Sequence, residues 1–177
     1  MKKHWLVLSL VLVVTIFTVG CGGSPKTSEN NNNNQEVAFT GESFENSYVS
    51  FTYPKDWKVA NQVEENIYTL VTLSRGDALS VDYFMIKVNK DDTTTPILDL
   101  GNQYAQFESI KGTPAELVTY GGTEYAKTAY KSGGYDQVHH IARVGNYLAT
   151  ITIQGYGKNL EEDKDVINMI KSIKYLK

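Results

Sequence analysis

The sequence contains a single cysteine, Cys21, among 177 residues. It can therefore form no internal disulfide, although exported domains often carry paired cysteines. It also lacks the Gly-x-Ser-x-Gly and His-Glu-x-x-His patterns of serine hydrolases and zinc proteases. We identify no catalytic residue, no metal site and no cofactor motif from these patterns. A catalytic triad is recognised by geometry, so an extracytoplasmic hydrolase with an unrecognised site stays an alternative.

The first twenty residues have the pattern of an export signal. Met1 to His4 is a short basic start, and Trp5 to Val19 carries no charge. Fifteen residues form a helix of about 22 Å, which is shorter than the hydrocarbon core of about 30 Å. A basic start followed by a short apolar run predicts a removable signal rather than a membrane-spanning helix.

The end of this run, Thr18-Val19-Gly20-Cys21, resembles the lipobox of bacterial lipoproteins. The resemblance implies that Cys21 receives a diacylglyceryl group and becomes the first residue after residues 1–20 are removed. Thr18 departs from the leucine usual in that family. Two acyl chains anchor a protein stably where one chain does not. We expect a lipid anchor at Cys21 that holds the protein on the outer face of the cell membrane, with an uncleaved anchor or ordinary secretion as alternatives.

The residues after Cys21 divide into a tether and one domain. Residues 21–36 comprise Cys21 and a tether. Gly22 to Glu36 contain five consecutive asparagines and no apolar residue that could offset the entropy cost of ordering, which predicts disorder. Residues 37–177 have the usual size of a single domain. Loss of Lys2 and Lys3 with the signal moves the formal charge from −3 to −5. This charge argues against nucleic acid as a partner and against an electrostatic contribution to membrane binding.

Hydrophobic periodicity predicts an α+β fold. Alternating patterns and hairpin signals predict six or seven strands, at 47–53, 67–73, 79–88, 116–120, 123–131, 135–144 and 147–154. A helix is expected after Thr95-Pro96, with a buried stripe at Ile97, Leu100, Tyr104, Phe107 and Ile110. A second helix is expected from Leu160, capped by Asn159, with a buried stripe at Val166, Met169, Ile170 and Ile173. We predict a single antiparallel sheet covered by helices.

Two short segments resemble the PsbP-like fold. Ser47 to Val59, which reads Ser-Tyr-Val-Ser-Phe-Thr-Tyr-Pro-Lys-Asp-Trp-Lys-Val, is similar to the opening strand of that family. Met169 to Tyr175 resembles its last helix and the exit from it. The resemblance implies the fold of photosystem II PsbP, of a Ran-binding transport protein and of many bacterial lipoproteins. It implies no activity, because these proteins share a scaffold and not a task.

Four residues are candidates for ligand binding: Trp57, Tyr135, His139 and Tyr147. Adjacent strand residues point to opposite faces, so His139 and His140 are not expected to share a metal ion. His139 could still join a partner from a neighbouring strand. The tyrosines on predicted strands suit either a shared binding face or ordinary sheet packing. Trp57 is alternatively a core residue that closes the edge of the sheet.

These observations predict a membrane-anchored extracytoplasmic lipoprotein and favour a non-catalytic role over the alternative of a hydrolase. We expect it to bind a protein or a small ligand, or to assist assembly, at the cell surface. A transporter's solute receptor is disfavoured because such receptors close two lobes around the ligand, and about 140 residues scarcely provide two lobes.

Overall fold

The computed structural model describes residues 40–77, 79–91, 93–106 and 112–177. The predicted signal, Cys21 and the tether lie outside these residues, as do Phe107 and Ile110. Within the described ranges, no helix has the length and hydropathy needed to cross a membrane.

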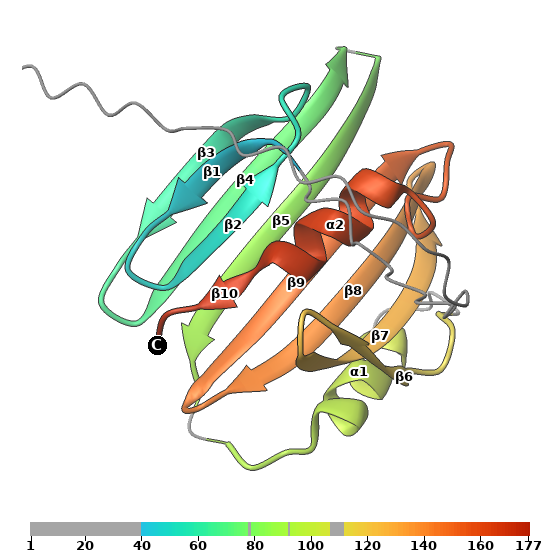
Figure 1. The fold of residues 1–177 in the computed structure, drawn as a ribbon. Helices are drawn as coiled ribbons and strands as arrows, with labels where there is room; N and C mark the ends of the chain where they lie inside the picture. Colours follow the sequence, from blue (N-terminus) through green and yellow to red (C-terminus); the bar gives the residue numbers. More distant parts are fainter. Residues whose placement is uncertain (1–39, 78, 92, 107–111) are drawn as a thin grey trace, which may run out of the picture. The chain divides into compact units, whose positions relative to one another are not determined.

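The described chain is built on a seven-stranded sheet in which every neighbouring pair is antiparallel (Figure 1). The strand order is β3-β4-β5-β9-β8-β7-β6. The strands are β3 (Lys58–Glu64), β4 (Tyr68–Asp77), β5 (Ser80–Lys90), β6 (Glu116–Tyr120), β7 (Thr123–Ser132), β8 (Tyr135–Val144) and β9 (Tyr147–Tyr156). The glycine pairs between β6 and β7 and between β7 and β8 have positive φ, as two-residue hairpin turns require.

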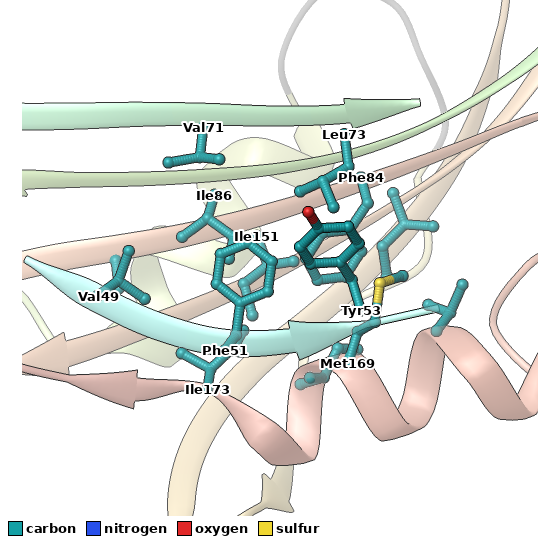
Figure 2. Close-up of a cluster of buried hydrophobic side chains, with 14 of the residues drawn as sticks. Val49, Phe51, Tyr53, Val71, Leu73, Phe84, Ile86, Ile151, Met169 and Ile173 are labelled. Atoms are coloured by element: carbon teal, nitrogen blue, oxygen red, sulfur yellow. The ribbon is translucent and has the colours of Figure 1, made fainter. Parts of the chain in front are cut away.

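A second, three-stranded sheet corrects the prediction of a single sheet. It has the order β1-β2-β10, from β1 (Glu42–Glu45), β2 (Val49–Tyr53) and β10 (Lys174–Tyr175). Strand β2 does not join the large sheet but lies across it. Its buried side chains Val49, Phe51 and Tyr53 face apolar side chains of the large sheet, as Figure 2 shows. Burying an apolar face against a second layer stabilises both sheets.

Helix α2 (Lys164–Ser172) packs against β2 on the same side of the large sheet. Its predicted stripe is confirmed, because Val166, Met169, Ile170 and Ile173 are all buried. The predicted start is wrong. Asp163, and not Asn159, caps the helix, and its carboxylate accepts hydrogen bonds from the amides of the first turn.

Helix α1 (Ile97–Gln106) lies on the opposite side of the large sheet, against β6, β7 and β8 (Figure 1). The residues that it buries are Gly101 and Ala105, whereas Tyr104 of the predicted stripe is 40% exposed. A Cβ atom at Gly101 would lie 2.7 Å from the Cβ of Ala115. Close approach to the sheet therefore selects small residues. Of the predicted stripe, Ile97 and Leu100 are half-buried, and only the placement of Tyr104 in a buried stripe is corrected.

The large sheet thus has two different faces. We call the face under α2 and the small sheet the inner face, and the face that α1 contacts the outer face. Helix α1 covers the outer face only at β6, β7 and β8. Of the described elements, none packs on the outer face of β4, β5 and β9, and most side chains there are half-buried.

Candidate functional site

Two neighbouring rows of side chains cross the outer face perpendicular to the strands. Directly paired residues of antiparallel strands point to the same face, so the register places each row. The first row contains Tyr130, Gln137, Gln154, Tyr83 and Ser74, on β7, β8, β9, β5 and β4. The second row contains His139, Thr152, Met85 and Thr72, on β8, β9, β5 and β4. We call these nine side chains the uncharged rows.

Hydrogen bonds link the rows where they approach α1. The Gln137 Oε1 atom accepts hydrogen bonds from the Tyr130 hydroxyl and from the Gln154 amide, each at 3.0 Å. Because the Tyr130 hydroxyl donates its only proton to Gln137, its 2.9 Å contact with His139 Nε2 requires a proton on that nitrogen. The Nδ1 atom of His139 then accepts from the Thr152 hydroxyl at 3.0 Å. The network therefore selects the neutral tautomer of His139 that is protonated at Nε2.

The ring of His139 is enclosed by aromatic side chains. It stacks on Tyr130, with ring centres 5.2 Å apart, and lies 5.5 Å from the ring of Tyr104 on α1. Burial lowers the pKa of His139 from 6.5 to about 4. The imidazole is neutral at pH 7, and both nitrogens are engaged in hydrogen bonds.

His140 points to the inner face, as expected for the neighbour of His139 in a strand. It is 2% exposed, and its ring meets those of Tyr120 and Tyr125 edge-on. Burial, together with the charge of Lys127 and the proximity of His139, lowers its pKa to about 3. The two imidazoles cannot bind one ion. Among the described residues, no three His, Cys, Asp or Glu side chains are grouped so that they could hold a metal.

The four residues proposed from the sequence do not converge. Tyr135 is on the outer face with His139, where its ring packs against Tyr156. Trp57 is 1% exposed and packs in the core against Phe84, which agrees with the alternative interpretation of this residue. Tyr147 lies in the core layer, with its ring edge-on to that of Tyr48. Trp57 and Tyr147 therefore do not reach a ligand bound beside His139.

The tyrosines of the strands are likewise divided between the two faces. Tyr83, Tyr130 and Tyr135 are on the outer face, whereas Tyr48 and Tyr125 are buried in the core. Sequence reasoning missed the glutamines and threonines of the rows. Their signal was the alternation of Thr150, Thr152 and Gln154 with small and β-branched apolar residues along β9.

A separate cleft of about 710 Å³ lies near the end of β8, between the segment before α1, the β6–β7 turn and β10. Arg143 lines it, but its guanidinium already donates to the Thr95 carbonyl at 3.2 Å and to Asp91 at 3.4 Å. These bonds hold the β5–α1 segment against β8. The guanidinium of Arg143 is thus largely paired with groups of the protein itself.

The sequence matches no family model and no curated protein. Solved structures do share its fold. A Bacteroides thetaiotaomicron protein aligns at a TM-score of 0.53 and 19% identity over 78% of this chain, which spans only about half (50%) of that protein. LpqN of Mycobacterium tuberculosis, involved in cell envelope biogenesis, aligns at 0.51 and 11% identity, covering 78% of this chain and 87% of LpqN.

The third similar structure is cyanobacterial PsbP (CyanoP) from Synechocystis, with a TM-score of 0.51 and 13% identity. The alignment covers 78% of this chain and 95% of CyanoP. The PsbP-like fold predicted from the two terminal segments is therefore supported. Identities this low establish a shared fold and not a shared activity.

Proposed function

We propose that this chain is a lipid-anchored protein of the cell envelope whose domain binds a ligand or a partner protein without catalysing a reaction. The proposal that the domain is not catalytic rests on the enclosure of both histidines of β8, His139 and His140. Histidine is the side chain best suited to proton transfer near pH 7. Here His139 is stacked and hydrogen-bonded through both nitrogens, His140 is 2% exposed, and each pKa lies far below 7.

The envelope location rests on two supports. The first is the lipobox-like segment that ends at Cys21. The second is the likeness in fold to LpqN, which is involved in cell envelope biogenesis. Binding is favoured over a purely structural role by the outer face of β4, β5 and β9, which carries an amide oxygen and hydroxyl groups that have no hydrogen-bond partner among the described residues.

The anchor is tested by metabolic labelling of the full-length chain with an alkyne fatty acid in its native host. Wild-type protein should incorporate the label, and Cys21→Ser should lose it entirely. Thr18→Leu restores the residue usual in lipoboxes and should retain the label, which makes it the matched control. An unlabelled wild-type chain, or a labelled Cys21→Ser variant, would contradict lipid anchoring at this position.

Binding is tested in intact cells with a photoreactive amino acid at Thr72, on the open part of the outer face. The same amino acid at Thr119, which is exposed on β6, provides the control. We expect a discrete adduct from position 72 only. Thr119 lies on the same face but on the far edge strand, so equal adduct patterns from the two positions would contradict a binding role for the open part of the outer face. Turnover of an envelope substrate by the purified chain would contradict the non-catalytic proposal.

A further inference from the structure

We propose that the uncharged rows are a binding site for a neutral, polyhydroxylated ligand, namely an oligosaccharide or a polysaccharide strand. This inference rests on the proposed function as a binding protein and names the ligand class. It is independent of the cleft at Arg143, which lies near the end of β8.

The first argument is charge. Charged residues make up 21% of the sequence, yet none of the nine side chains in the rows carries a formal charge at neutral pH. The only titratable group among them near neutrality is His139, which the network holds neutral. Lys58, which pairs with Ser74, and Lys87 on β5 lie at the margins of the rows, but a charged ligand centred on the rows would lose hydration without gaining a counter-ion there. The surface is therefore complementary to an uncharged ligand.

The second argument is hydrogen-bonding capacity. The hydrogen bond between the two glutamine side chains of the first row joins the amide nitrogen of Gln154 to the amide oxygen of Gln137. The amide nitrogen of Gln137 and the amide oxygen of Gln154 therefore have no hydrogen-bond partner among the described residues. The hydroxyl groups of Tyr83, Ser74 and Thr72 likewise have no hydrogen-bond partner among the residues that the structure describes. Donors and acceptors thus alternate along the rows, and sugar hydroxyls, which donate and accept, match both. A protein partner would favour a more apolar centre, whereas Met85 is the only aliphatic side chain in the rows.

The third argument is preorganisation. The hydrogen bonds from Tyr130 and Gln154 to Gln137 fix the orientation of both amides before any ligand arrives. A fixed amide loses little rotamer entropy on binding, which increases affinity. Tyr104, which is 40% exposed on α1, borders the rows beside His139 and provides a ring face against which the C–H groups of a sugar can pack.

The fourth argument is extent. From Ser74 on β4 to Gln137 on β8, the first row crosses three inter-strand spacings, or about 14 Å. At its β4 end the row continues onto the edge strand β3, where the exposed Lys58 pairs with Ser74. An extended ligand of several sugar units can follow this row, whereas a single sugar would leave most of its donors unused.

The test uses the protein as purified from its native host in a zwitterionic detergent, because detergents with sugar headgroups would compete. Isothermal titration calorimetry with N-acetylglucosamine and glucose oligomers of six units should give saturable binding of at least one series. An anionic hexamer of galacturonic acid should bind at least tenfold more weakly. Absence of saturable binding by both neutral series, or tighter binding of the anionic hexamer, would overturn the inference.

Variants locate the site. Gln154→Ala removes one of the two amides and should weaken binding at least tenfold, the effect of about 1.4 kcal/mol. Gln62→Ala makes the same change at an exposed position on β3, outside the rows, and should bind like the wild type. Thr72→Val removes one hydroxyl with little change in volume, and it provides a second measurement if Gln154→Ala fails to fold. Equal affinity of the row variants and the wild type would place the ligand elsewhere and overturn the inference.

The result separates this inference from the proposed function. If no oligosaccharide binds while position 72 still crosslinks a protein in cells, the ligand class is wrong and the binding function stands. If oligosaccharides bind while Cys21 proves unmodified, the site stands and the lipid anchoring fails.

Discussion

Arg75 on β4 hydrogen-bonds through its guanidinium to the carboxylate of Asp163, the residue that caps α2. The same guanidinium donates to the buried Asp82 on β5 at 3.0 Å and lies over the ring of Trp57. One cation therefore connects the large sheet, the start of α2 and the tryptophan of the core. The capping residue of α2 is thereby tied to the large sheet.

Asp163 should contribute to stability in two separable ways, as a helix cap and as an ion-pair partner. Asp163→Asn keeps a good cap and loses the charge, so we expect a loss of about 1 kcal/mol. Asp163→Ala loses both roles, and we expect about 1 kcal/mol more. Urea unfolding measures both free energies. Asp165→Asn, in the first turn of α2, is the control, and equal stability of the Asn and Ala variants would show that the cap contributes nothing.

Gly101 should be intolerant of a methyl group although alanine is the better helix former. The added Cβ would lie 2.7 Å from the Cβ of Ala115 and 3.1 Å from that of Ala126. We expect Gly101→Ala to destabilise the domain by about 1–3 kcal/mol, because overpacking outweighs the gain of about 1 kcal/mol in helix propensity. Thermal unfolding should show partial rescue in the double variant with Ala115→Gly. A stabilised single variant would contradict this packing of α1.

Acidification should destabilise the domain over a defined range of pH. The pKa values of His139 and His140 are about 4 and about 3 in the folded state, whereas an unperturbed histidine has a pKa of 6.5. Between pH 6.5 and 4 the unfolded chain binds more protons than the folded chain, so the free energy of unfolding decreases as the pH falls. Each histidine contributes on the order of 3 kcal/mol to this loss. Urea unfolding at pH 7.5, 6 and 4.5 measures it, and a flat profile would contradict the burial of these rings.

Lys127 should influence His140 through its charge. Its ammonium group pairs with Glu116 at 2.6 Å and with Glu161, and its charge is one cause of the low pKa of His140. Lys127→Met should therefore raise the pKa of His140, although burial, the larger cause, keeps it below 6.5. NMR titration of the ring protons measures the shift. The control is Lys131→Met. Lys131 lies on the same strand but is more exposed and pairs with Asp136, so its loss should leave the pKa of His140 unchanged.

Local patterns in the sequence predicted most of the regular structure. The strands of the meander from Glu116 to Gln154 and the buried stripe of α2 follow from alternation, helical spacing and glycine turns, which are local properties. The missed strands lack such signals. Strand β3 is almost wholly exposed and irregular at Ala60, and β10 has only two residues. Strand β1, which was also missed, and β3 each pair with the strand that follows them in the chain, whereas β10 pairs with β2, far from it in the sequence.

The candidate site was predictable only in part. His139 and Tyr135 were identified as residues of interest, and their common face follows from the period of a strand. The partners of His139 could not be identified in this way, because Tyr130 and Thr152 reach it through the registers of two further strands. Trp57 and Tyr147 looked equally suitable in the sequence, but packing buried one and placed the other in the core layer.

The sequence by itself determined the expectation of export and lipid attachment at Cys21, because a signal segment is recognised as a linear string without any fold. It also determined where most strands and both helices lie, since these depend on neighbouring residues. Only the tertiary structure decided that β2 packs across the large sheet, that Gly101 brings α1 against one end of it, and that side chains of five strands align in two rows. The reason is that register and layering depend on contacts between residues far apart in the chain, which no local pattern specifies.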